Sequence, residues 1–209
     1  MIETLLAAAI GFALGSIPFS LLMGRIFGGV DIRKAGSGNV GATNVARTAG
    51  WGPGLLALLL DAAKGAAAVL LARLCCPGAP AADLVAGGMA VLGHLVSPFL
   101  RFRGGKGVAT GAGVFLVLAP GALCVAALVF AVTVALSRYV SLASVGAAIA
   151  MPVAAFLLGL RGGITLLALV VAVAVIARHR GNLARLRAGK ERRLGERRRS
   201  DRRKAEASR

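Results

Sequence analysis

The longest polar interval before the C-terminal tail, residues 31–48, combines residue types that bind phosphate. Its sequence is DIRKAGSGNVGATNVART, and it lies between two apolar runs. Basic side chains supply charge, hydroxyl and amide side chains supply hydrogen bonds, and glycines allow backbone N–H groups to approach a ligand. The candidate binding residues are Ser37, Asn39, Thr43, Asn44 and Arg47. An anionic, oxygen-rich ligand suits this interval, although an ordinary positively charged cytoplasmic loop would have a similar composition.

A second polar interval, residues 101–110, has the sequence RFRGGKGVAT and the content of a phosphate-binding loop. Gly104, Gly105 and Gly107 surround Lys106. The interval is not a Walker A motif, because Gly107 stands where Ser or Thr belongs and because an apolar run, not a strand, precedes it. A tight basic turn is the alternative interpretation.

Two shorter polar intervals complete the set. Residues 138–144 (RYVSLAS) contain Ser141, and residues 178–182 (RHRGN) contain His179 and Asn182. Neither histidine of the chain is followed by Asp five positions later, no Gly-x-Ser-x-Gly elbow is present, and no cluster of His, Cys or carboxylates fits a metal site. We therefore expect no metal and no cofactor. A site of this composition works by positioning substrates and by stabilising negative charge.

The elements that carry these intervals are predicted to be membrane helices. The chain is 57% hydrophobic and contains 29 glycines, and apolar runs near 20 residues recur along it. A run of that length crosses about 30 Å of hydrocarbon at about 1.5 Å per residue. The runs are apolar all round, which excludes the alternation of a transmembrane barrel. The fold class is thus an all-α polytopic membrane protein.

We predict seven transmembrane helices, with the N-terminus outside and the C-terminus cytoplasmic. The expected spans are residues 5–23, 55–71, 84–100, 108–119, 120–137, 139–158 and 164–176. The break at Pro120 is chosen because it returns Arg138 and the basic tail to the side of the other basic intervals, as the positive-inside rule favours. All four polar intervals then converge at the cytoplasmic face.

Two charges interrupt the second predicted span. Asp61 and Lys64 are three residues apart and therefore share one helix face, where they can pair. A charge in the middle of a membrane is costly, at about 2.5–3.5 kcal/mol on insertion scales. A structural ion pair and a site-lining role are both open at this stage.

The C-terminal segment is predicted to be a separate region. Of the net charge of +17, most lies after residue 177, where 14 Lys and Arg residues face four Asp and Glu residues. We divide the chain into a membrane domain, residues 1–184, and a basic, disordered cytoplasmic tail, residues 185–209. Attachment of the tail to anionic lipid headgroups is the alternative.

Taken together, the motifs resemble those of the bacterial acyl-phosphate:glycerol-3-phosphate acyltransferase family. The resemblance rests on GSGNVGATNVART, FRGGKGVATG, RYVSLAS and RHRGN, with GSIPFS and DAAKG between or before them, and it extends to about residue 189. It implies a seven-helix enzyme of the bacterial cytoplasmic membrane with its active site at the cytoplasmic face. Such an enzyme transfers a fatty acyl group from acyl phosphate to the 1-hydroxyl of glycerol 3-phosphate, the first step of phospholipid synthesis.

The resemblance also implies roles for individual residues. Catalytic roles would fall to Ser37, Arg47, Lys106, Ser141, His179 and Asn182, and substrate binding to Asn39, Thr43, Asn44, Gly104, Gly105 and Gly107. The base would be a phosphate oxygen of the substrate, with His179 as the alternative on the protein. The expected partners are the two substrates and the lipid bilayer, with no nucleic acid, and we expect a monomer.

Two rival functions remain open from the residues alone. A transporter for a small phosphorylated anion would also contain intramembrane charges and broken helices. The polar residues collect at one predicted face, however, and the outer connections offer no matching gate. A non-catalytic scaffold does not explain four polar, basic intervals on one side of the membrane.

Overall fold

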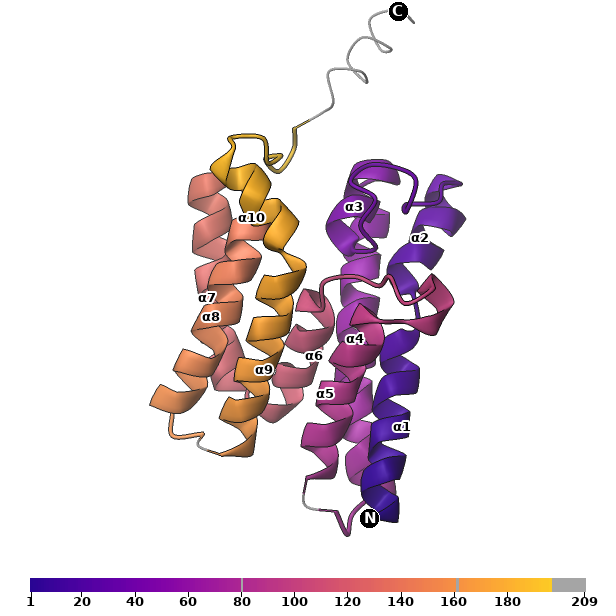
Figure 1. Ribbon diagram of the computed structural model, residues 1–209, viewed down its shortest axis with the longest axis vertical. Coiled ribbons are helices and arrows are strands. Elements are labelled where there is room, and N and C mark those ends of the chain that lie inside the picture. The colour runs from indigo at the N-terminus through magenta and orange to yellow at the C-terminus, as the bar shows by residue number, and fades with distance from the viewer. Residues whose placement is uncertain (80, 161, 197–209) are drawn as a thin grey trace, which may run out of the picture.

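The computed structural model describes residues 1–79, 81–160 and 162–196, which form helices and connections without any strand (Figure 1). The elements are α1 (Ile2–Ser16), α2 (Phe19–Gly28), α3 (Ala42–Thr48), α4 (Trp51–Cys75), α5 (Ala82–Leu95), the 3₁₀ helix η1 (Pro98–Leu100), α6 (Val108–Leu118), α7 (Pro120–Ser137), α8 (Val140–Leu157), α9 (Gly163–Arg178) and α10 (Arg180–Arg187). The all-α class is confirmed.

Five helical segments in this part of the chain are long and apolar enough to cross a membrane. The first consists of α1 with α2, and the third consists of α5 with η1. The other three are α4, α7 and α8. A sixth results if α9 and α10, which meet at a bend of 54°, form one span. Helix α6 is apolar but has only 11 residues, about half the length that a span needs.

Two prolines set the helix breaks. Helix α1 ends at Ser16, and Pro18 precedes the first residue of α2, because proline removes a backbone donor and clashes with the preceding turn. Helices α6 and α7 are separated at Ala119, immediately before Pro120. The predicted break at Pro120 is therefore present.

Small residues bring the membrane helices into close contact. A Cβ atom on Gly15 of α1 would lie 2.0 Å from the carbonyl oxygen of Ala90 in α5, and one on Gly113 of α6 would lie 1.8 Å from that of Ala62 in α4. In a membrane, where lipid is as apolar as Leu, helices associate through such close packing. These contacts fix the positions of α5 and α6, which carry the second polar interval between them.

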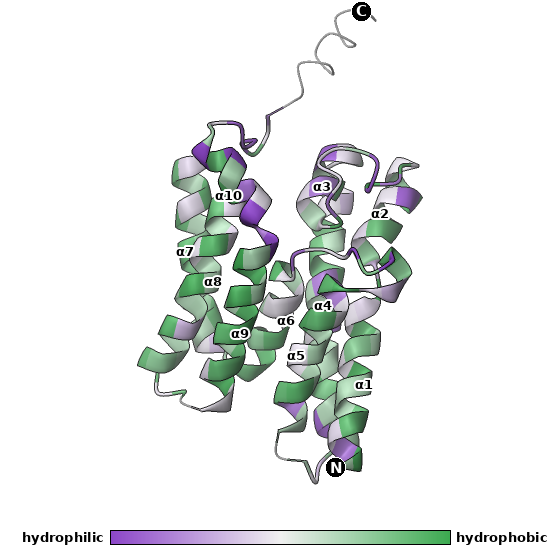
Figure 2. Cartoon of the chain, in the orientation of Figure 1, coloured by the Kyte–Doolittle hydropathy of each residue, from purple (hydrophilic) through white to green (hydrophobic). Residues whose placement is uncertain are grey.

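Polar residues gather at one end of the helices (Figure 2). Apolar residues cover the lengths of α7, α8 and α9, while hydrophilic residues are concentrated in α10 and around α3. The N-terminus lies at the opposite end of the molecule from α3 and α10 (Figure 1). Large exposed apolar side chains such as Leu128, Leu136 and Leu166 lie on the helix surfaces, which is the arrangement expected of a lipid-facing exterior.

Candidate active site

Asn44 organises the first polar interval from within. Its side chain is buried in α3, donates hydrogen bonds to the carbonyl oxygens of Ile32 (2.8 Å) and Ala35 (3.1 Å), and accepts one from the N–H of Ser37 (2.7 Å). Gly36 adopts a left-handed φ of 62°, and a Cβ atom there would lie 2.1 Å from the Asn44 Oδ1. Asn44 therefore shapes the loop that presents Ser37.

The second polar interval folds back onto the end of α5. The N–H of Gly104 donates to Leu95 O and that of Gly105 to His94 O, both at 3.1 Å. On the other side, the Arg178 guanidinium donates to the carbonyl oxygens of Gly104 (2.6 Å) and Gly105 (3.0 Å). These two N–H groups are thus engaged in folding the loop. Lys106 and Gly107 continue from it into the first turn of α6, whose leading N–H groups have no partner within the helix.

The remaining two intervals supply a hydroxyl and an imidazole. Ser141 lies in the first turn of α8, and its buried hydroxyl faces the carboxylate of Glu191. His179 lies at the bend between α9 and α10, with Nδ1 2.8 Å from the Val175 carbonyl oxygen. Because a carbonyl only accepts, Nδ1 carries the proton and Nε2 retains its lone pair.

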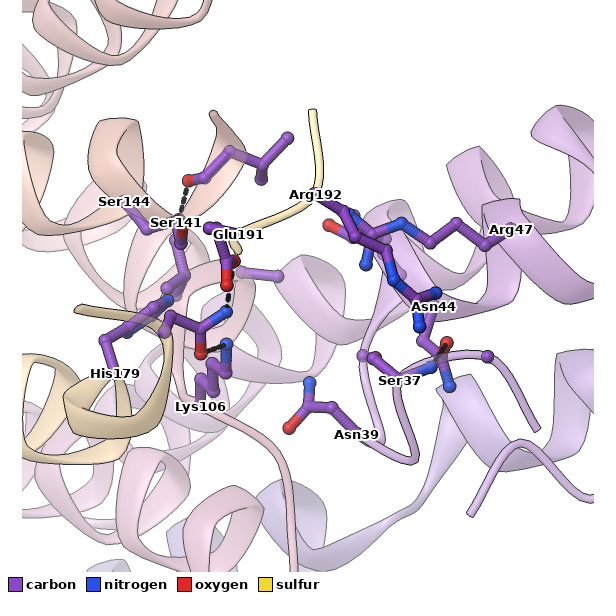
Figure 3. Close-up of a pocket in the computed structure, with 18 of the residues that line it drawn as sticks. Ser37, Asn39, Asn44, Arg47, Lys106, Ser141, Ser144, His179, Glu191 and Arg192 are labelled. Carbon is purple, nitrogen blue, oxygen red and sulfur yellow. Dashed lines mark hydrogen bonds between the residues drawn. The ribbon is translucent and has the colours of Figure 1, made fainter. Parts of the chain in front are cut away.

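These segments enclose a polar cavity of about 620 Å³. Ten of the twelve predicted site residues line it, and they are Ser37, Asn39, Thr43, Asn44, Arg47, Lys106, Gly107, Ser141, His179 and Asn182. Gly104 and Gly105 do not reach the cavity, because they lie behind Lys106 against α5. The four intervals that the sequence separates by up to 151 positions are therefore brought to one place (Figure 3).

A chain of hydrogen bonds runs along one side of the cavity (Figure 3). Lys106 Nζ donates to Asn182 Oδ1 at 2.5 Å, and Asn182 Nδ2 donates to Glu191 Oε1 at 2.6 Å. The second oxygen of Glu191 accepts from Arg185 Nε at 2.8 Å. Burial opposes ionisation of Glu191, but the hydrogen bonds from Asn182, Ser141 and Arg185 outweigh it and lower the pKa of the carboxyl. A carboxylate is therefore bound among donors that also suit phosphate.

Burial lowers the pKa of Lys106 to about 8. The carboxylate of Glu191 opposes this shift, whereas the positive charges of Arg185, Arg47 and Arg178 add to it. Across the cavity, burial and the nearby guanidinium of Arg192 likewise lower the pKa of Arg47. Cations held close together in this way favour the binding of an anion between them.

Three residues that were not predicted from the sequence also line the cavity, and they are Arg185, Glu191 and Arg192. They belong to the segment that we predicted as a tail. Its backbone is held to the start of α8 by two hydrogen bonds, from Leu194 N to Arg138 O (2.7 Å) and from the Arg138 guanidinium to Leu194 O (2.9 Å). One usable signal was the spacing of Asn182 and Arg185, which places both on one face of a helix. Residues 197–209 lie outside the described residues.

A second, apolar cavity of about 340 Å³ adjoins the polar one. The two cavities have six lining residues in common, and they are Leu58, Gly107, Val108, Ala109, Phe130 and Ser144. The remainder of the apolar cavity is walled by side chains of α6, α7, α8 and α9. The site can thus hold an anionic group and a hydrocarbon chain side by side, with Lys106 next to the junction.

A helical membrane protein with a cationic cavity joined to an apolar one has a site suited to an anionic group attached to a hydrocarbon chain. Comparison with known proteins defines the class further. A family model described as glycerol-3-phosphate acyltransferase matches residues 5–189, and the chain belongs to this family. The predicted resemblance is confirmed.

Curated relatives match nearly the full length of the chain. A glycerol-3-phosphate acyltransferase of Synechococcus sp. (strain JA-3-3Ab) is 50% identical over 196 residues, which cover 93% of this chain and 95% of the relative. One of Desulforudis audaxviator (strain MP104C) is 46% identical over 193 residues, covering 92% and 96%.

Solved structures share the fold. The crystal structure of PlsY (YgiH), an integral membrane glycerol 3-phosphate acyltransferase, in its glycerol 3-phosphate form has a TM-score of 0.86 and 38% identity and covers 92% of this chain and 96% of its own. The lysophosphatidic acid form of PlsY has a TM-score of 0.84 at 38% identity, with coverage of 92% and 95%.

Proposed function

We propose that this protein transfers a fatty acyl group from acyl phosphate to the 1-hydroxyl of glycerol 3-phosphate, giving lysophosphatidic acid and inorganic phosphate. The observation that carries the proposal is the junction of the cationic cavity with the apolar cavity beside Lys106. Acyl phosphate has this shape, a phosphate attached to a hydrocarbon chain. Family membership and the two PlsY structures, described as a glycerol 3-phosphate form and a lysophosphatidic acid form, support the acceptor and the product.

The two phosphates would occupy opposite parts of the polar cavity. Lys106 lines the polar cavity next to the N-terminus of α6, which borders both cavities, and we place the phosphate of the acyl donor there, with its chain among α6 to α9. Arg47 and the loop of Ser37 lie across the cavity with Arg192 (Figure 3), and we place the phosphate of glycerol 3-phosphate there. Ser141, His179 and Asn182 would then orient the reacting groups between the two.

In the reaction, the 1-hydroxyl oxygen attacks the acyl carbonyl carbon. A carbon–oxygen ester bond forms, the bond between the acyl carbon and the phosphate oxygen breaks, and phosphate leaves with the electron pair. Lys106 stabilises the negative charge that grows on the departing phosphate. The hydroxyl proton goes to a phosphate oxygen of a substrate or to Nε2 of His179, which carries a lone pair.

We further propose seven membrane spans, with α6 as the short one, the N-terminus outside and the polar cavity at the cytoplasmic face of a bacterial cytoplasmic membrane. The basic residues of the cavity and the N-terminus lie at opposite ends of the molecule, and the positive-inside rule assigns the basic end to the cytoplasm. We also propose a monomer as the active unit, because one chain by itself brings ten of the twelve predicted site residues to the cavity.

The test is an assay of the purified full chain in lipid vesicles with palmitoyl phosphate and glycerol 3-phosphate. We expect equal amounts of lysophosphatidic acid and phosphate to form with the native protein, and a rate lower by about 10²–10³-fold with a folded Lys106→Met variant. Uptake of a phosphorylated compound into vesicles without product would overturn the proposal in favour of a transporter. Equal rates for the native and variant proteins would overturn the placement of the donor phosphate.

His179→Gln distinguishes the two candidates for the base. Glutamine can keep a hydrogen bond to the Val175 carbonyl, but it cannot take a proton. If a substrate phosphate is the base, kcat falls by about tenfold or less, and the pH–rate profile below pH 7 keeps its shape. A loss of about 10²–10⁴-fold, the usual contribution of a general base, would instead assign the base role to His179. The thermal midpoint of the variant, measured in the same lipid, controls for folding.

A further inference from the structure

Four polar side chains that the proposed mechanism does not use form a buried ionic cluster below the cavity. It consists of Ser20 on α2, Asp61 and Lys64 on α4, and His94 on α5. Lys64 Nζ lies 2.7 Å from Asp61 Oδ1, Ser20 Oγ donates to Asp61 Oδ2 at 2.7 Å, and His94 Nδ1 lies 3.7 Å from Asp61 Oδ1. The side chains of Asp61 and Lys64 are each 2% exposed.

On one side, the buried ionic cluster holds the break between α1 and α2. Lys64 Nζ donates to the carbonyl oxygen of Ile17 at 2.7 Å. Ile17 follows the last residue of α1 and precedes Pro18, and a proline leaves carbonyl groups of the preceding turn without their helical donor. Lys64 adds a side-chain donor to the Ile17 carbonyl, which also accepts the N–H of Phe19 at 3.1 Å, and Ser20 of the next helix is bound to Asp61, the ion-pair partner of Lys64. The direction of α2, and of the first polar interval that follows it, is therefore tied to α4.

On the other side, the cluster contacts the second polar interval. A Cβ atom on Gly105 would lie 2.2 Å from His94 Nε2 and 2.4 Å from the carbonyl oxygen of Val40. The backbone of Gly105 is thus enclosed between the His94 ring and the first polar interval, to which Val40 belongs. The carbonyl of His94 also accepts the N–H of Gly105 at 3.1 Å. Asp61 and His94 themselves reach the wall of the polar cavity.

A buried ion pair of this kind is weak evidence for a contribution to stability. The cost of removing two charges from water often exceeds their attraction, so that apolar or neutral replacements of a buried pair are frequently as stable as the original. The contacts of this cluster run instead to the two intervals that, under the proposed function, hold the two phosphates. A displacement between those intervals would separate the reacting atoms, and about 1 Å is enough to slow a reaction about 100-fold.

We propose that Ser20, Asp61, Lys64 and His94 are positioning residues, which fix the first and second polar intervals relative to each other so that the acceptor hydroxyl meets the acyl carbon. This inference rests on the proposed acyl transfer. It means that the Asp61–Lys64 pair contributes to kcat. Each of the two intervals binds its own substrate largely without the pair.

The test is the double variant Asp61→Asn/Lys64→Met, assayed as full-length protein in lipid with palmitoyl phosphate and glycerol 3-phosphate. The two substitutions remove the opposite charges together, and the asparagine that replaces Asp61 keeps an acceptor for Ser20. We expect kcat to fall about 30- to 100-fold, with KM for each substrate within about threefold of the native value and a thermal midpoint within a few degrees. Binding of glycerol 3-phosphate, measured by calorimetry, is expected to keep its native stoichiometry.

The matched control is Arg73→Met/Asp83→Asn. Arg73 and Asp83 form an ion pair of 3.1 Å between the same two helices, α4 and α5, at their other end. This control is expected to keep native kcat. The native protein is measured alongside. Failure of the proposed function would appear as no turnover in any of the proteins, whereas failure of the positioning role alone would appear as near-native kcat in the double variant.

Two results would overturn the inference. One is a double variant with kcat within threefold of native, which would leave the cluster a structural ion pair. The other is a loss of kcat matched by an equal loss of binding stoichiometry and a lower thermal midpoint, which would reduce its role to folding. If the double variant does not fold, Ser20→Ala removes a single hydrogen bond from Asp61 and should still lower kcat about fivefold at unchanged KM. An unchanged kcat in that variant would also contradict the proposal.

Discussion

Gly104→Ala is expected to abolish acyl transfer, with a loss of at least about 100-fold in kcat/KM. The new Cβ atom would lie 2.0 Å from the carbonyl oxygen of His94 and 2.8 Å from that of Leu95. Both are backbone atoms at the end of α5, so no side chain can turn away to make room. The loop must move out of its place, and Lys106, two residues later, moves with it.

A second alanine variant makes the result specific. Gly52 lies in the first turn of α4 and would place a Cβ atom in open space, with nothing within 4 Å. Gly52→Ala should keep native turnover and, because alanine favours the helix by about 0.5–1 kcal/mol over glycine, should not lower the thermal midpoint. Steady-state rates with both substrates, measured on protein of verified fold, decide the matter. Native kcat/KM in Gly104→Ala would show that the docking of the loop onto α5 does not govern the position of Lys106.

The charge of Lys106 is expected to govern activity at alkaline pH. The pKa of this lysine is lowered to about 8, well below the ordinary value of about 10.4, so that the ammonium form predominates below pH 8 and is lost above it. Since the ammonium is the form that binds phosphate, kcat/KM should fall about tenfold for each unit of pH above 8. Neutral isosteric replacement, Lys106→Met, should cost about 10²–10³-fold at pH 7.

Lys106→Arg separates this ionisation from others in the same range. A guanidinium stays charged throughout the accessible pH range, so kcat/KM of the arginine variant should not fall near pH 8. Its activity at pH 7 should be lower than native, because the guanidinium does not reproduce the contact of Lys106 with Asn182. The initial rate of lysophosphatidic acid formation between pH 6 and pH 10, corrected for spontaneous hydrolysis of the acyl phosphate, gives both profiles. An alkaline limb that persists unchanged in the arginine variant would assign it to another group.

Sequence alone was sufficient for the features that depend on hydropathy and on local chemistry. Long apolar runs predicted the helices, and proline together with the charge of Arg138 predicted the break at Pro120. The sequence did not predict α3, because a seven-residue helix inside a polar interval has no apolar periodicity. Asn44 holds this helix in place through hydrogen bonds to residues up to 12 positions away.

The candidate site was predictable in its residue types and less so in its geometry. Glycine and lysine content indicated a phosphate loop, yet the N–H groups of Gly104 and Gly105 bind carbonyls of α5, because tertiary packing decides which donors remain available. Glu191 was not predicted because it lies in an arginine-rich segment, and the composition of that segment indicates a solvated tail. Only the folded chain shows that this carboxylate lies between Asn182 and Arg185.

The joined cavities place the two proposed substrates in different phases. Acyl phosphate, with its chain among α6 to α9, would arrive by diffusion in the plane of the bilayer, whereas glycerol 3-phosphate would arrive from water. Saturation by the donor would then depend on its mole fraction among the lipids, and saturation by the acceptor on its concentration per volume. A cell that enlarges its membrane at a constant amount of donor would dilute one substrate and not the other, so that growth of the bilayer itself would slow the enzyme that feeds it.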